Sequence, residues 1–394
     1  MIKLKVAVLF GGRSGEHEVS LVSAQSVMRA LDRDRFEVIP VGITRDGAWI
    51  VGHDPVKALQ QEDFSKTRAA ALFADPSKQG LWATVDPPAD ESASAELAAG
   101  SSDTDKLATL SQVDVVFPVL HGTFGEDGTV QGLLELAGVP YVGAGVLASA
   151  LAMDKIAFKD VVKSHGIAIP DYVWTTRRRW LVDPDAVSEA VESELSYPVF
   201  TKPANLGSSV GITKCHHREG LRKGLAEAAR YDRRILIERA VPMAREIEVS
   251  VLGNEEPSAS VPGEIIPSRE FYDYAAKYLL EGEDASKLLI PAPLDDDVTA
   301  QIQELAIRTY KAIDGAGMAR VDFLVNGGTD EIYLNEVNTI PGFTPISMYP
   351  KLWEASGVPY EQLLSWLIDL ALERYQENAR SERVYRPGEE QRPG

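Results

Sequence analysis

Residues 4–20 read LKVAVLFGGRSGEHEVS and predict how the chain begins to fold. The run over 4–10 is short, apolar and rich in β-branched residues, which is typical of a buried strand. Gly11 and Gly12 end this run, and the residues after them place apolar side chains on one side of a helix. Further strands are predicted over 36–43, 113–120 and 139–142. Strands that alternate with helices indicate an α/β protein with a parallel sheet.

The length of 394 residues predicts more than one domain, because single cores seldom grow to this size. The stretch 54–110 is rich in Ala, Ser, Asp and Gln, and its part over 86–105 has almost no aromatic or β-branched residue, which indicates a partly disordered surface excursion. One long helix is predicted over 150–165 and another over 360–374. We expect an N-terminal Rossmann-like domain over 1–150 with an insertion at 54–110, α+β units over 151–245 and 246–375, and a polar tail over 376–394.

The composition narrows the classes of partner. A formal net charge of −19 disfavours nucleic acid, because binding its phosphates requires clustered Lys and Arg. An anionic ligand such as ATP would need a local concentration of cations. The single cysteine, Cys215, excludes an internal disulfide framework and fits a reducing compartment. The N-terminal apolar run is too short for a signal peptide, and no run approaches the about 18 apolar residues of a membrane span. We therefore expect a cytoplasmic protein that does not bind membranes.

The glycine-rich turn over 10–20 is the first candidate ligand site. It does not match G-x-G-x-x-G, so it is a poor dinucleotide fingerprint. Glu16 and Glu18 lie at the start of the predicted helix, where carboxylates favour the helix dipole. They would repel a pyrophosphate and suit a ligand with an ammonium group. A structural turn and a ligand site both remain open for this segment.

A second glycine-rich segment over 197–214 reads YPVFTKPANLGSSVGITK. A predicted strand ends at Lys202, and the glycines of the loop allow backbone N–H groups to converge on an oxyanion. The Lys202 ammonium adds a full positive charge. No G-K-[ST] follows the glycines, which excludes a Walker-type loop. The segment therefore predicts a phosphate site, with an ordinary hairpin loop as the alternative.

Residues 319–338, ARVDFLVNGGTDEIYLNEVN, predict a hairpin that carries oxygen ligands. Side chains alternate between the two faces of a strand, so Arg320 and Asp322 share one face. Glu336 and Asn338 share a face of the partner strand, and every register with an even residue sum places all four on one surface. Two carboxylates and an amide oxygen suit Mg²⁺, whereas zinc is disfavoured because no Cys or His is near. Solvated hairpin carboxylates are the alternative.

The stretch 339–350 follows this hairpin and contains several Pro and Gly residues. It leads into a predicted helix and offers backbone N–H groups around Gly342 and Ser347–Met348. Such donors can bind a carboxylate or stabilise an oxyanion.

Taken together, these segments resemble the D-alanine–D-alanine ligases of the ATP-grasp superfamily. The resemblance is carried, in order along about 6–374, by GGRSGEHEVS (11–20), HGTFGEDGT (121–129), MDK (153–155), KPANLGSSVG (202–211), REIEV (245–249), FYDYAAKY (271–278) and NEVNTIPGF (335–343). It implies an ATP-grasp fold behind an N-terminal Rossmann-like domain. It also implies an enzyme that activates a D-alanine carboxylate as an acyl phosphate with ATP and couples it to a second D-alanine, and that forms a homodimer.

The same resemblance assigns roles to matching residues. Catalysis would involve Glu16, Ser208, Tyr278, Arg320 and Gly342, and the substrates would be bound by Glu16, His121, Lys277, Ser347 and Met348. ATP would contact Lys159, Lys202, Gly207, Ser208, Ser209, Val210, Glu238, Ala240, Val241 and Glu246. Two Mg²⁺ ions, with Mn²⁺ as a substitute, would be held by Asp322, Glu336 and Asn338. A lid is expected over 271–287, and Tyr278 within its motif favours an amine over a hydroxyl acceptor.

Two other functions fit these residues less well. A dinucleotide-dependent oxidoreductase lacks the glycine fingerprint and the acidic residue after the second strand, and leaves the 319–338 carboxylates unexplained. A binding protein without activity would be expected to have lost a metal ligand or Arg320, and none is missing.

Overall fold

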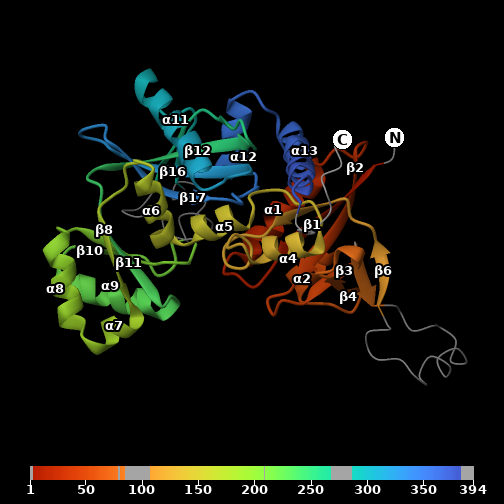
Figure 1. Cartoon of the computed structure of the whole chain (residues 1–394), viewed down its shortest axis with the longest axis horizontal. Coiled ribbons are helices and arrows are strands. Elements are labelled where there is room, and N and C mark those ends of the chain that lie inside the picture. The colour runs from red at the N-terminus through yellow and green to blue at the C-terminus, as the bar shows by residue number, and fades with distance from the viewer. Residues whose placement is uncertain (1–2, 79, 85–106, 208, 268–285, 383–394) are drawn as a thin grey trace, which may run out of the picture.

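A computed structural model of the chain describes residues 3–78, 80–84, 107–207, 209–267 and 286–382. The N-terminal domain lies at one end of the molecule and the central unit at the opposite end (Figure 1). The third unit, which contains β12 (Ala244–Gly253), β16 (Gly317–Asn326) and α11 (Asp296–Ala312), lies between them. The α/β class predicted from the sequence is confirmed. Among the described helices, none is both long and apolar enough to cross a membrane.

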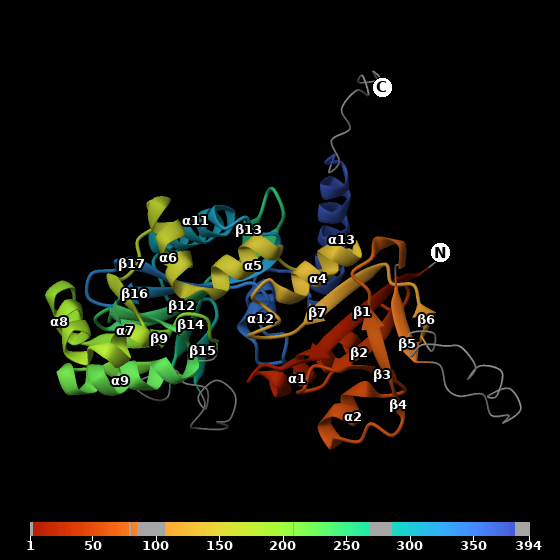
Figure 2. The same ribbon diagram turned by 60° about the horizontal axis from the view of Figure 1, so that its bottom comes forward.

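The N-terminal sheet has seven strands in the order β6-β5-β4-β3-β2-β1-β7. Only β1, β2 and β7 are parallel, and the outer strands pair antiparallel (Figure 2). Both faces of β1 are buried: Val8 faces α1 and α13, and Leu9 faces α4, which explains the unbroken apolar run. The elements are β1 Leu4–Gly11, α1 His17–Ala30, β2 Phe36–Ile43, β3 Trp49–Gly52, α2 Pro55–Gln61, β4 Thr67–Leu72, a 3₁₀ turn Pro76–Lys78, β5 Leu81–Thr84, β6 Leu107–Ser111, β7 Val115–Val119, α4 Thr129–Ala137 and α13 Tyr360–Ala379.

Several sequence expectations need correction here. The stretch 54–84 is not a surface excursion, because β4 and β5 extend the sheet across β3. Residues 139–142 form only an isolated bridge between Val116 and Tyr141. The helix expected over 150–165 is two helices, α5 Val146–Met153 and α6 Lys155–Ser164. Asp154 separates them because its side chain accepts the Ala157 amide and caps α6. Helix α13 extends five residues beyond 374, into the start of the expected tail.

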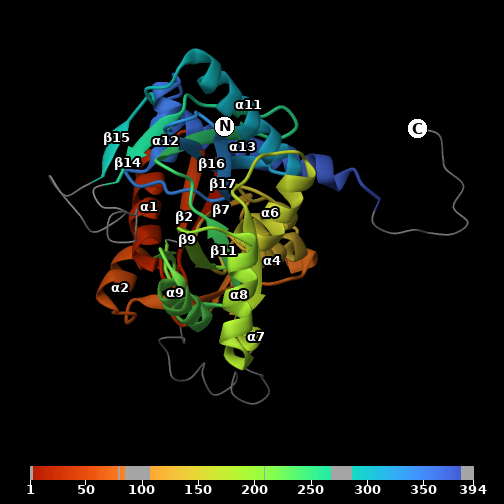
Figure 3. The ribbon, with the colours of Figure 1, turned by 90° about the vertical axis from the view of Figure 1, so that its left-hand side faces the viewer.

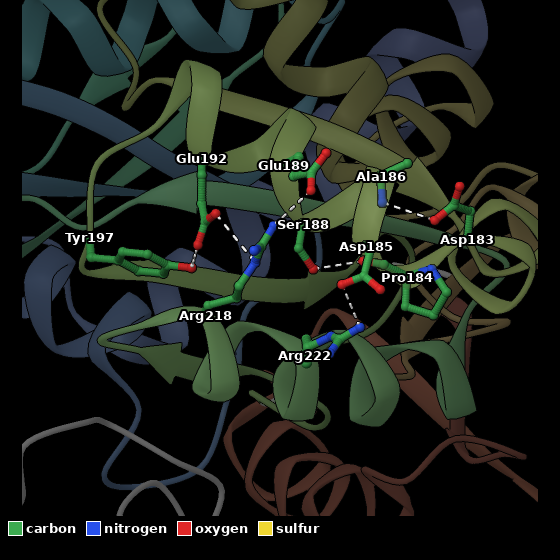
Figure 4. Close-up of polar contacts among 10 residues, drawn as sticks. All are labelled: Asp183, Pro184, Asp185, Ala186, Ser188, Glu189, Glu192, Tyr197, Arg218 and Arg222. Carbon is green, nitrogen blue, oxygen red and sulfur yellow. Dashed lines mark hydrogen bonds and ion pairs between the residues drawn. The ribbon is translucent and has the colours of Figure 1, made fainter.

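The central unit is a four-stranded antiparallel sheet in the order β10-β9-β11-β8, covered on one face by three helices. Figure 3 looks onto α8 and α9 of this unit. Arg218 and Arg222 of α9 form ion pairs with Glu192, Glu189 and Asp185 of α8 at the surface (Figure 4). The elements are β8 Tyr172–Thr176, α7 Arg177–Val182, α8 Pro184–Glu194, β9 Val199–Pro203, β10 Thr213–Cys215, α9 Arg218–Tyr231 and β11 Arg234–Arg239.

The third unit has a sheet in the order β15-β14-β12-β16-β17, with β13 paired to β12. Val249, Val321 and Phe323 point into a core shared with α5, α6 and α11. Strand alternation therefore directs the charged residues of β12 and β16 to the opposite face, toward the central unit. The elements are β12 Ala244–Gly253, β13 Ser258–Ala259, β14 Gly263–Ile266, β15 Lys287–Leu289, α11 Asp296–Ala312, β16 Gly317–Asn326, β17 Ile332–Asn338 and α12 Met348–Ala355.

Candidate active site

A cavity of about 310 Å³ lies between the central sheet and the charged face of the third sheet. Its walls come from β9 and β11 on one side and from β12, β16 and β17 on the other. The structure thus brings together most of the residues expected to bind nucleotide or metal. Those that line the cavity are Lys202, Gly207, Ser209, Glu238, Ala240, Val241, Glu246, Asp322 and Glu336.

Lys202 and Glu238, which line this cavity, form a buried cluster of charges with Lys159. The Glu238 carboxylate is 2.5 Å from the Lys159 ammonium and 2.9 Å from the Lys202 ammonium. Burial alone would raise the pKa of Glu238, but the two ammonium groups outweigh it and lower that pKa to about 2. Burial lowers the pKa of Lys159, whereas for Lys202 the attraction of Glu238 overcomes burial and raises the pKa. The two lysines therefore share the Glu238 carboxylate as their buried counter-ion.

The glycine loop that follows β9 is anchored at its base. The Lys155 side chain donates to the Leu206 carbonyl at 2.7 Å, and the Lys155 amide donates to the Ala204 carbonyl at 3.0 Å. Gly211 has a φ of +73°, and a Cβ there would lie 2.7 Å from the Tyr231 ring. This glycine is therefore required both by its backbone conformation and by its close packing. Val210 lies in the loop, and Ser208 is outside the described residues.

The hairpin of β16 and β17 adopts one of the predicted even-sum registers. Arg320 pairs with Asn338 and Asp322 with Glu336, and a bulge follows Asp322. Asn338 Nδ2 donates to Asp322 at 3.0 Å, which leaves the amide oxygen of Asn338 available to a cation. Arg320 is held from both sides, at 2.7 Å from Asp322 and 3.0 Å from Glu248. Burial would lower the pKa of Arg320, but its carboxylate neighbours raise it well above the ordinary value.

Glu248 was missed by the sequence reasoning. It pairs with Asp322 across β12 and β16, so Glu248, Asp322 and Glu336 form a row across three strands. The signal was the alternation of Glu246 and Glu248, which places both on one face of a strand. Within the described ranges, no three acidic, His or Cys side chains are already arranged as a metal site. The oxygen donors of this row nevertheless have the chemistry that Mg²⁺ requires.

The turn over 10–20 also reaches the glycine loop. Glu16 precedes α1, and a Cβ at Gly122 would lie 2.5 Å from its carboxylate, while one at Gly207 would lie 3.1 Å away. The carboxylate therefore lies between the 121–129 motif and the loop after β9. The expected partners Lys277 and Tyr278, and most of the expected lid, are outside the described residues.

The remaining predicted residues lie near the stretch after β17. His121 is buried, with Nδ1 3.0 Å from the Ile340 carbonyl and Nε2 3.1 Å from the Ser23 hydroxyl. Both ring nitrogens therefore contact protein groups. A Cβ at Gly342 would lie 2.6 Å from the Ser347 hydroxyl, which itself accepts the Thr344 amide at 3.0 Å. Met348 is buried and begins α12.

Two family models together match nearly all of the chain. The model of the D-ala D-ala ligase N-terminus matches residues 5–144, and that of the C-terminus matches 161–369. The D-alanine–D-alanine ligase of Natranaerobius thermophilus is 49% identical over 97% of this chain and 98% of its own length. That of Thermoanaerobacter sp. (strain X514) is 52% identical over 96% of this chain and 99% of its own.

Solved structures of similar ligases agree with these matches. The VanG D-Ala:D-Ser ligase from Enterococcus faecalis superposes with a TM-score of 0.79 at 36% identity, covering 94% of this chain and 100% of that one. The D-alanine–D-alanine ligase from Coxiella burnetii superposes with a TM-score of 0.78 at 35% identity, covering 96% and 97% respectively. The similarity therefore extends over the N-terminal domain and both units that form the cavity.

Proposed function

This chain belongs to the D-alanine–D-alanine ligase family, and we propose that the residues around its cavity carry the two chemical steps of that ligation. It is an ATP-dependent ligase that joins D-alanine to D-alanine for cell-wall synthesis. One observation carries the proposal for the site. A single cavity is lined both by the glycine loop with Lys202 and by the carboxylates of Asp322 and Glu336.

In the first step, the carboxylate of one D-alanine attacks the γ-phosphorus of ATP, and ADP leaves. Phosphoryl transfer to an anion requires neutralisation of charge. Lys159, Lys202 and the loop that contains Gly207, Ser209 and Val210 bind the phosphates. The adenosine lies near Ala240, Val241 and Glu246. Glu238 holds the two lysines in place at 2.5 and 2.9 Å. It therefore lies beside the adenosine and acts mainly by positioning the lysines that bind the phosphates.

We assign the metal ions to Asp322 and Glu336, which line the cavity, and to Asn338, which pairs with Arg320 on the same hairpin. These are the hard donors that Mg²⁺ and Mn²⁺ take in company with phosphates and water. Two Mg²⁺ ions bound there would neutralise charge between the phosphates and the attacking carboxylate. The bulge after Asp322 locally changes the pairing of the hairpin next to these ligands.

In the second step, the amine of the second D-alanine attacks the acyl carbon, and inorganic phosphate leaves. The oxyanion that develops is stabilised by Arg320 and the amide of Gly342. Glu16 binds the ammonium of the first D-alanine and forms a hydrogen-bonded group with Ser208 and Tyr278. His121 supports this substrate through the loop that it contacts. Lys277, Ser347 and Met348 receive the carboxylate of the second substrate, and the lid over 271–287 excludes water from the acyl phosphate.

The test is a reaction of purified protein with D-alanine, ATP and Mg²⁺, scored for phosphate and dipeptide. NADH turnover without dipeptide would contradict the proposal. The metal assignment is tested with Glu336→Gln, which we expect to abolish phosphoryl transfer while the melting temperature stays close to that of the parent. Glu331→Gln is the matched control, because Glu331 lies on the same hairpin at its exposed end. Full activity of Glu336→Gln would remove Glu336 from the metal site.

We further infer a homodimer from the family resemblance, which light scattering on the purified protein tests. A monomer at assay concentrations that is fully active would overturn it. The requirement for ATP supports a cytoplasmic location.

A further inference from the structure

The segment from Ile340 to Phe343 joins strand β17, which carries Glu336 and Asn338, to the stretch before α12, and it contains Gly342. The three backbone N–H groups of this segment, those of Ile340, Gly342 and Phe343, differ in their hydrogen bonding. The Ile340 N–H donates to Glu126 Oε1 at 3.1 Å, and the Phe343 N–H donates to the Ser23 hydroxyl at 3.3 Å. Pro341 has no N–H to donate. Among the described residues, no group accepts the Gly342 amide, and Gly342 is partly exposed between the buried residues Pro341 and Phe343.

Glu126 contacts two segments with its two oxygens. Oε1 accepts the Ile340 amide, and Oε2 accepts the Gly122 amide at 2.7 Å. Gly122 follows β7 in the N-terminal domain, whereas Ile340 follows β17 in the third unit. The Glu126 side chain therefore joins the two at the wall where the Glu16 carboxylate also lies. The cost of leaving a buried amide without an acceptor favours this arrangement over a displaced loop.

Ser23 and His121 hold the same segment from another side. His121 Nδ1 must donate, because its partner is the Ile340 carbonyl. In the neutral ring Nε2 must then accept, and Ser23 supplies the proton from its hydroxyl while its oxygen accepts the Phe343 amide. Burial lowers the pKa of His121, which favours the neutral ring that this chain of bonds requires. Each donor in the chain therefore has one acceptor.

We propose that Glu126, Ser23 and His121 form a clamp from the N-terminal domain that positions the 340–343 segment, so that the Gly342 amide is presented to the oxyanion of the amide-forming step. None of the three needs to touch the reacting atoms. They act as positioning residues, through hydrogen bonds to the amides and the carbonyl on either side of Gly342. This rests on the proposed function, because it gives the Gly342 amide a role only if an acyl group is transferred.

The clamp explains why the Gly342 N–H is left available, whereas the N–H groups of Ile340 and Phe343 are bonded. Donors that stabilise a transition state are effective when they are fixed before the reaction. A loop held only by the third unit would move with that unit, whereas a loop bonded to Glu126 and Ser23 also keeps its distance from the N-terminal residues around Glu16. The Gly342 amide and the Glu16 carboxylate are thereby held at a fixed position relative to each other.

The test separates the two chemical steps. Phosphoryl transfer is measured alone by scrambling of an isotopic label from the β,γ-bridge oxygen of ATP in the presence of D-alanine, and the complete reaction by dipeptide formation. The variants are Ser23→Ala, which removes both bonds of the hydroxyl, and Glu126→Gln, which keeps one acceptor oxygen. Glu135→Gln is the control, because Glu135 lies on α4 of the same domain and its carboxylate accepts from the Tyr141 hydroxyl at 2.9 Å.

We expect Ser23→Ala and Glu126→Gln to slow dipeptide formation by about 10- to 100-fold, less than the about 10²–10³ for complete loss of an oxyanion donor. Label scrambling and the KM for ATP should change by less than about threefold, and Glu135→Gln should match the parent. Unchanged dipeptide formation in both variants, or an equal loss of scrambling and dipeptide, overturns the clamp. Absence of dipeptide from the parent protein instead refutes the proposed function. If Glu126→Gln does not fold, Ser23→Ala alone decides.

Discussion

Replacing Glu238 by Gln tests whether the buried charges of the cavity are arranged as we describe. The carboxylate is 1% exposed and contacts two ammonium groups at 2.5 and 2.9 Å. Removing one partner from a buried ion pair typically costs about 3–5 kcal/mol, because the remaining charge stays buried without compensation. Here two lysines would lose their shared anion. We therefore expect Glu238→Gln to lower the free energy of unfolding at pH 7 by about 3–5 kcal/mol.

The pH dependence gives an independent measure. Lowering the pKa of Glu238 from 4.5 to about 2 corresponds to about 3 kcal/mol of folding free energy. Because the folded-state pKa is depressed, this contribution is present above pH 4.5 and is lost as the pH falls toward 2. The difference in the free energy of unfolding between the parent and Glu238→Gln should therefore be about 2 kcal/mol smaller at pH 3 than at pH 7.

The assay is urea unfolding at several pH values, repeated with ATP. Glu192→Gln is the control, because Glu192 is partly exposed at the surface, where it contacts Arg218 and the Tyr197 hydroxyl (Figure 4). Such surface pairs contribute about 1 kcal/mol or less. ATP should restore part of the stability of Glu238→Gln, because its phosphates supply negative charge next to Lys159 and Lys202. A variant within about 0.5 kcal/mol of the parent at pH 7, or a difference that does not narrow in acid, would refute the reasoning.

Three further predictions are independent of this one. Tyr278→Phe should gain the use of D-lactate as acceptor, measured as ester product, and no gain would contradict the role of Tyr278 in selecting an amine. Arg222→Ala should lower the free energy of unfolding by less than about 1 kcal/mol, and by less still in high salt. The reason is that Arg222 and Asp185 form an ion pair at 2.9 Å and both side chains are exposed. A larger loss would contradict the description of this pair as a surface pair. Cys215 is buried and burial raises the pKa of its thiol, so it should react with a thiol reagent far more slowly in the folded than in the urea-unfolded protein, and equal rates would contradict its burial.

Local patterns in the sequence were sufficient for part of the site. The strand alternation of 319–338 required Arg320, Asp322, Glu336 and Asn338 to share a face in any even-sum register, and the observed pairing is such a register. The glycines after Lys202 likewise predicted a loop at the end of a strand, and the structure has it. Both predictions succeed because the residues involved lie close together in the sequence and the periodicity of a strand fixes which of them share a face.

Other features depend on pairings that the sequence does not specify. Glu248 joins the carboxylate row only because β12 lies antiparallel to β16, about 70 residues away. Asp154 could have been recognised as a helix cap, but the apolar pattern continues across it. The stretch 67–84 is rich in small residues and yet forms strands, because its neighbours supply the pairing that its own side chains do not favour.

Glu126 and Glu238 show most clearly where residue type alone gives no answer. Both are glutamates, and their pKa values move in opposite directions. Burial raises the pKa of Glu126 to about 8, with the nearby Glu16 adding to the effect, whereas two ammonium groups overcome burial and lower that of Glu238 to about 2. The lysines that decide the second case come from α6 and β9, and the amides that Glu126 accepts come from two different domains. Glu238 is therefore a fixed charge that organises cations, and Glu126 is an acceptor that holds backbone. Tertiary contacts determine which of these two roles each glutamate has. The residues that position a donor can therefore be identified only from the packed structure of all the units.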